Sequence, residues 1–176
     1  NCVNRKVPFY NKIKSFKGSE AITKVGQMNL GAVFLETVCH LVNVGTTIVC
    51  IFPKAHLTER GEEAVAFRRM LLNLFGLHTI FNYPAEGLFD SVTEETCIFV
   101  GKVLQKTKEV LVYSSDVKVA DIDLHALQSV TSGYCRKDFA TVFPGVEARV
   151  FDWSELDTAV EDGWRMVCSE MSEAID

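Results

Sequence analysis

Two loops of the 176-residue chain carry side chains that could contact a ligand. The first follows the apolar run TTIVCIF and contains Pro53, Lys54 and His56. The second follows the run HTIFNY and contains Phe89, an aromatic ring between two strand-like segments. Lysine and histidine side chains can contact a polar substrate, and an aromatic ring can stack on a planar base. Both loops are therefore candidates for a substrate site, with an anchoring role of Phe89 in the core as the alternative.

The segments around these loops alternate between helix and strand patterns. Residues 30–41 place Leu30, Phe34, Val38 and Leu41 on one apolar helix face. The run at 46–52 is apolar throughout, which predicts a strand covered on both faces.

A second helix is predicted to begin at Thr58 and to end before Gly76, with arginines 68 and 69 on a solvated face. Its predicted buried residues are Phe67, Met70, Leu71 and Leu74. Further strands are predicted at 77–83, 95–103 and 109–115, and a short strand followed by a helix with Ser154 as its cap near the C-terminus. This order predicts an α/β fold with a mostly parallel sheet, a terminal antiparallel pair and flanking helices.

In an open parallel sheet, ligands bind beyond the carboxyl ends of the strands. Pro53 and Pro84 each end a predicted strand, so we expect the two loops to adjoin at that edge. The sequence contains no G-x-G-x-x-G and no G-x-x-x-x-G-K-[ST], so it has no recognisable phosphate-binding loop. It also lacks the G-x-S-x-G of a nucleophile elbow, which disfavours a small hydrolase.

Cysteine spacing and charge add further limits. None of the six cysteines forms a C-x-x-C pair, so we expect buried reduced thiols and no metal site. The net charge is −5, yet residues 1–24 carry six basic residues and one acidic residue. Such an arm can bind phosphate groups, or it can be a solvated segment beside a domain boundary. The chain has neither a membrane-spanning apolar run nor a secretory pattern, so we expect a cytoplasmic protein.

The ordered segments FLETVCHLVNVG, IVCIFP, FRRMLL, IFNYP, GLF and TCIFV resemble the C-terminal half of the catalytic domain of N6-adenine DNA methyltransferases. The resemblance is to modification subunits of type I restriction systems and to their fused type II relatives. It covers residues 28–117 well and 145–167 loosely. The family's D-x-x-x-G-x-G cofactor loop and its catalytic N-P-P-[YF] tetrapeptide are both missing from this sequence.

The resemblance implies a partial Rossmann-like methyltransferase sheet in an enzyme that uses S-adenosylmethionine, with DNA and specificity or restriction subunits as partners. It implies that Phe89 stacks on a flipped-out adenine, since enzymes that modify a base must extrude it. By the same resemblance, Asn1 or Asn4 would accept a hydrogen bond from the adenine amino group, and Phe9 would be the accompanying ring.

The predicted organisation has three parts: a basic arm at 1–27, the methyltransferase-like half domain at 28–117, and a helical or hinge extension at 118–176. The contacts expected with the DNA backbone come from Arg5, Lys6, Lys12 and Lys14. Two functions remain open at this point. The chain is part of an adenine-N6 methyltransferase, or it is a non-catalytic module for complex assembly or DNA contact.

Overall fold

The structure is a computed structural model that describes residues 22–23, 29–83, 95–117, 140–143 and 145–168. For 140–143 only the backbone is described. Its elements follow one another in the order α2 (Leu30–Leu41), β1 (Thr47–Pro53), α3 (Ala55–Thr58), α4 (Glu62–Met70), the π-helical turn η1 (Leu71–Phe75), β2 (Leu77–Asn82), β3 (Thr96–Lys102), β4 (Glu109–Ser115), β5 (Ala140–Phe143), β6 (Val146–Asp152), α6 (Trp153–Thr158) and α7 (Arg165–Cys168).

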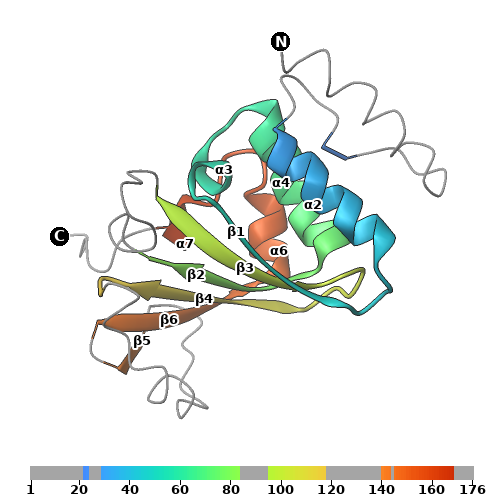
Figure 1. The fold of residues 1–176 in the computed structure, drawn as a ribbon. Helices are drawn as coiled ribbons and strands as arrows, with labels where there is room; N and C mark the ends of the chain where they lie inside the picture. The colour runs from blue at the N-terminus through green and yellow to red at the C-terminus, as the bar shows by residue number, and fades with distance from the viewer. Residues whose placement is uncertain (1–21, 24–28, 84–94, 118–139, 144, 169–176) are drawn as a thin grey trace.

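The strands form one six-stranded mixed sheet in the order β1-β3-β2-β4-β6-β5 (Figure 1). The α/β class is therefore confirmed, but the prediction of a mostly parallel sheet is wrong. Only β2 and β4 pair in parallel, and the other four neighbouring pairs are antiparallel. The reason is that β3 inserts between β1 and β2, which run in the same direction, and pairs antiparallel with both.

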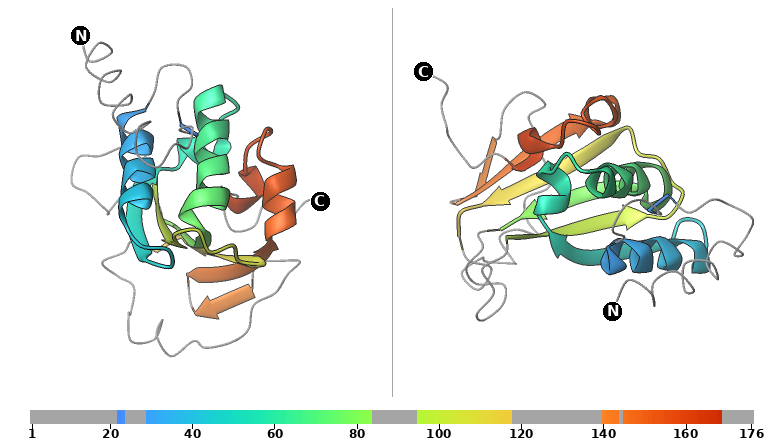
Figure 2. Two further views of the ribbon diagram at one scale, coloured as in Figure 1. Left: turned by 90° about the vertical axis from the view of Figure 1, so that its right-hand side faces the viewer. Right: turned by 90° about the horizontal axis from the view of Figure 1, so that it is seen from above.

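The described helices lie on one face of this sheet (Figure 2). Strands β3 and β4 alternate between buried and half-buried residues, so one face of each strand packs beneath the helices. Cys97, Phe99, Val110 and Val112 lie on this covered face with no solvent exposure. The main core is therefore the layer between the sheet and its helices.

Helix α2 forms where the sequence predicts it, but its most apolar face points outward. Leu30, Phe34 and Leu41 are 56%, 63% and 57% exposed, whereas Leu35 and Cys39 are buried against the core. The helical periodicity was read correctly, but it could not say which apolar stripe faces this sheet.

The second predicted helix is divided into three pieces. Thr58 ends the short helix α3, and α4 begins after Gly61 in extended conformation, so the predicted start at Thr58 is wrong. The predicted buried residues of this segment are confirmed, since each is at most 6% exposed: Phe67, Met70, Leu71 and Leu74. Gly76 ends η1 in the left-handed region with φ 65°, as its glycine predicts.

The C-terminal elements pack under the same helical layer. Helix α6 begins at the N-cap Asp152, whose main-chain N–H donates to Glu155, so the predicted cap at Ser154 is wrong. Trp164 is completely buried, and its indole Nε1 donates to the main-chain oxygen of Leu156 at 2.8 Å. No helix in the described ranges is long and apolar enough to cross a membrane.

Candidate functional site at the carboxyl edge of the sheet

Three strands of the same direction end together at one edge of the sheet. Pro53 at the end of β1 lies opposite Thr96, and Asn82 at the end of β2 lies opposite the adjacent Cys97. Strand β4 runs parallel to β2 and brings Ser114 beside Asn82. The loops that follow β1 and β2 therefore open at the same edge, which is where ligands bind in sheets of this type.

The first residue after β1 is held by both main-chain and side-chain contacts. The N–H of Lys54 donates to the main-chain oxygen of Glu95 at 2.8 Å, and its ammonium lies 3.0 Å from the Glu95 carboxylate. The Lys54 side chain is 13% exposed, and that of Glu95 is 50% exposed. This double contact fixes the residue that immediately precedes β3 and closes the loop after β2.

The other end of that loop is fixed through Asn82. Its side-chain Nδ2 donates to the main-chain oxygen of Val167 in α7 at 2.6 Å. Asn82 Oδ1 and the neighbouring Ser114 hydroxyl are both buried and have no hydrogen-bond partner among the described residues. Buried polar atoms of this kind usually bind an ordered water or a ligand group.

His56 packs into the core rather than projecting from the edge. Its ring lies 5.1 Å from the Phe67 ring and 6.1 Å from the Phe52 ring, measured between centroids. Its Nε2 lies 3.1 Å from Nδ2 of Asn29, whose Oδ1 accepts the N–H of Gly31 at the start of α2. His56 therefore ties the N-terminus of α2 to the loop after β1.

Arg68 is a structural centre that the sequence did not predict. The prediction of a solvated face is wrong for Arg68, which is completely buried, whereas its exposed neighbour Arg69 pairs with Glu161. Arg68 Nε donates to the main-chain oxygen of Val160 at 2.8 Å, and Nη1 donates to that of His56 at 2.8 Å. Burial lowers the pKa of this guanidinium, and nearby carboxylates partly oppose the shift.

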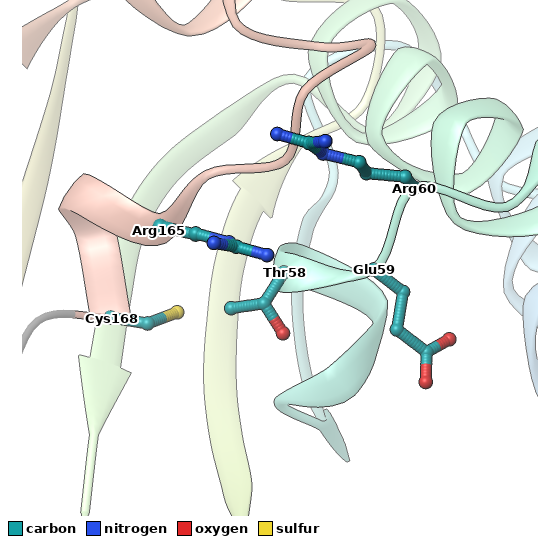
Figure 3. Close-up of a pocket in the computed structure, with 5 residues that line it drawn as sticks. All are labelled: Thr58, Glu59, Arg60, Arg165 and Cys168. Carbon is teal, nitrogen blue, oxygen red and sulfur yellow. The ribbon is translucent and has the colours of Figure 1, made fainter.

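A pocket of about 570 Å³ lies beside this centre, between α3 and α7. Figure 3 shows Arg165 extending toward Thr58, while Arg60 extends in another direction. Cys168 also lines it, and burial raises the pKa of its thiol to about 12, so the thiol is neutral at physiological pH and unsuited to nucleophilic attack. Within the described ranges, no three His, Cys, Asp or Glu side chains are grouped to hold a metal ion.

The structure places only some of the predicted site residues. Pro53, Lys54 and His56 lie at the carboxyl edge, and their substrate contacts stay a prediction. Phe89 and the N-terminal candidates lie outside the described residues, the latter being Asn1, Asn4, Arg5, Lys6, Phe9, Lys12 and Lys14. Sequence reasoning missed Asn29 and Asn82. An asparagine before an apolar helix is an N-cap signal that could have found Asn29.

Solved structures similar to the chain come from restriction-modification systems. The type IIG restriction endonuclease BpuSI matches with a TM-score of 0.80 and 38% identity, over 92% of this chain and 18% of the BpuSI chain. The M protein of the type I restriction enzyme EcoKI matches with a TM-score of 0.57 and 17% identity, over 77% of this chain and 36% of that one. A methyltransferase subunit of a type I restriction-modification system from Streptococcus thermophilus matches with a TM-score of 0.53 and 16% identity, over 78% and 30%.

These similarities confirm the resemblance seen in the sequence and support a methyltransferase-related module. The chain spans less than a fifth of the BpuSI chain. The type I proteins, which are less than 25% identical to the chain, support the fold alone. No protein-family profile matches the sequence, and no curated protein sequence matches it.

Proposed function

We propose that this chain is part of a DNA adenine-N6 methyltransferase of a restriction-modification or related defence system, and that it contributes the target-base side of the active site. The observation that carries the proposal is the anchoring of the loop at 84–94. Asn82 is held from α7 before the loop, and Glu95 is held by Lys54 after it. A loop fixed at both ends at the carboxyl edge can present one side chain to a substrate at a defined position.

Phe89 is the aromatic residue of that loop. We infer that its ring stacks on the extruded adenine, which offsets part of the cost of taking the base out of the duplex. Stacking of this kind contributes about 1–3 kcal/mol per base. Asn1 or Asn4 would accept from the adenine amino group and Phe9 would be a second ring, while Arg5, Lys6, Lys12 and Lys14 would contact phosphates.

The described residues do not fit S-adenosylmethionine. The carboxyl edge has no glycine-rich loop after a strand, Lys54 is paired with Glu95, and the His56 ring packs on Phe67. The methyl donor would therefore be held by residues outside this chain. We expect the 176-residue chain to show no measurable binding in calorimetry with S-adenosylmethionine, and micromolar binding would contradict this assignment.

The test of the adenine role uses the longer protein that carries this chain. We expect Phe89→Ala to lower methyl transfer to a DNA duplex by about 5- to 150-fold, which corresponds to the loss of 1–3 kcal/mol of stacking. Phe89→Tyr, which keeps an aromatic face, should retain most activity, whereas Phe89→Leu should not. Mass spectrometry of the digested DNA should find N6-methyladenine.

Thermal unfolding separates this role from a core role. If Phe89→Ala lowers the melting temperature in proportion to its activity, Phe89 is a packing residue and the stacking proposal is wrong. A folded longer protein that binds DNA and transfers no methyl group would instead favour the second candidate, a non-catalytic module for complex assembly or DNA contact. That candidate is favoured by the absence of N-P-P-[YF] from the sequence.

A further inference from the structure

Exposed large apolar side chains gather at one edge of the molecule. All of those found in the described part of the chain lie on α2, on β1, in the turn between them, or in the turn after β3: Leu30, Phe34, Leu41, Val44, Val49, Ile51 and Leu104. The two turns are adjacent, because Gly45 N–H donates to the main-chain oxygen of Val103 at 2.8 Å. We call this set of seven residues the apolar edge. Scattered exposed apolar residues are ordinary, but a contiguous group marks an interaction surface.

Strand β1 forms the middle of the apolar edge and has one open side. It is the terminal strand of the described sheet and pairs only with β3. Lys54 N–H bonds to Glu95, and bonding alternates along an antiparallel pair, so the main-chain groups of Thr47, Val49 and Ile51 point away from β3. Pro53, which has no N–H, also occupies an outward position. The open side therefore offers a regular row of donors and acceptors.

The sequence of β1 is that of an interior strand. The segment TIVCIFP has no charged residue, and its β-branched, apolar composition is typical of strands that are covered on both faces. Yet Val49 and Ile51 are 63% and 45% exposed. Proteins protect open edges with charges, bulges or short strands, and β1 has seven residues paired in unbroken register. The prediction of a strand covered on both faces is thus not met within the described residues.

The direction of the chain identifies what fits there. The chain leaves β1, passes through α4 on the helical face, and enters β2, which lies on the inner side of β1 (Figure 2). Helix α2 lies on the same face and leads into β1. Because crossover connections keep one hand, a strand that precedes α2 and runs parallel to β1 must lie on the outer side of β1.

We propose that the apolar edge is the seat of a parallel strand from the part of the same polypeptide that precedes α2, with an apolar layer that covers Phe34 and its neighbours on α2. The strand would pair with the outward groups of Thr47, Val49 and Ile51, and would continue the sheet. The sheet seen here would then be one side of a larger sheet. This inference does not depend on the reaction proposed above, and it would stand if no methyl transfer were found.

Amide hydrogen exchange followed by NMR tests the proposal residue by residue. In the 176-residue chain, we expect the amides of Val49 and Ile51 to exchange quickly and those of the inward Cys50 and Phe52 to exchange slowly. In a longer polypeptide that includes the sequence upstream of this chain, exchange at Val49 and Ile51 should slow by about 100-fold or more. Equally fast exchange in both proteins would overturn the proposal.

A substitution provides an independent measurement. Ile51→Lys should lower the melting temperature of the longer polypeptide by about 4–8 °C, but change that of the 176-residue chain little, because the side chain is already 45% exposed there. Asp157→Lys, at an exposed position of α6, is the control and should be neutral in both. If light scattering instead shows a dimer of the 176-residue chain with Val49 and Ile51 protected, a second copy is the occupant and the proposal is wrong.

Discussion

Replacing Arg68 by methionine should destabilise the chain far more than the same replacement at Arg69. Arg68 is completely buried and makes two hydrogen bonds of 2.8 Å, to the main-chain oxygens of Val160 and His56, and a longer one of 3.2 Å to that of Leu57. A hydrogen bond from a charged donor contributes about 1.5–3 kcal/mol, so losing the two short bonds costs about 3–6 kcal/mol.

Part of this loss is recovered by the substitution itself. Arg68 Nη2 is buried without a hydrogen bond, and no carboxylate pairs with the guanidinium directly, so the wild-type protein carries a desolvation cost that methionine removes. The main-chain oxygen of Leu57 also keeps the N–H of Trp164 as a partner at 2.6 Å. We therefore expect a net loss of about 2–4 kcal/mol in the free energy of unfolding.

Urea unfolding of the 176-residue chain, followed by circular dichroism, measures this quantity. Arg69→Met is the matched control, because its ion pair with Glu161 joins side chains that are 55% and 64% exposed and should contribute less than about 1 kcal/mol. A loss at Arg68 no larger than the loss at Arg69 would refute the assignment of the buried guanidinium as a structural centre.

Two further predictions concern close packing and buried thiols. Gly101→Ala should cost about 2 kcal/mol or more, because an added Cβ would lie 2.3 Å from the Phe75 ring, whereas Gly61→Ala has open space and should change stability by less than about 1 kcal/mol in urea unfolding. Burial raises the pKa of the Cys50 and Cys168 thiols from 9.0 to about 12, so their neutral forms stabilise the fold fully below pH 9, and this contribution is lost as the pH rises toward 12. The urea midpoint should fall over that interval, and a double Cys→Ala variant should show a smaller fall; an identical fall in both proteins would contradict the role of the thiols.

Local patterns in the sequence predicted the positions of most elements. The strands at 47–53, 77–82, 96–102 and 109–115 lie within one or two residues of the predicted segments. These patterns reflect side-chain periodicity and turn-forming glycines, which act over a few residues. The substrate-loop residues Pro53, Lys54 and His56 were placed correctly at the edge for the same reason, since a strand end is a local property.

Features that depend on distant parts of the chain were not predictable in this way. The burial of Arg68 depends on the main-chain oxygen of Val160, which lies 92 residues later in the chain. The outward turn of Phe34 depends on which strands lie beneath α2. The position of β3 between β1 and β2 is likewise a tertiary choice that periodicity does not encode. The three-part division at 1–27, 28–117 and 118–176 stays a prediction.

The tether between Asn82 and Val167 has a practical consequence for dissecting this protein. It spans 85 residues and joins the second strand to the last described helix. A polypeptide shortened at residue 152 would lose that tether, the oxygen of Val160 that receives Arg68, and the indole of Trp164 from the interior. Deletion series that search for a minimal folded piece should therefore keep residues through 168, since an earlier stop removes mutual supports from opposite ends of the chain at once.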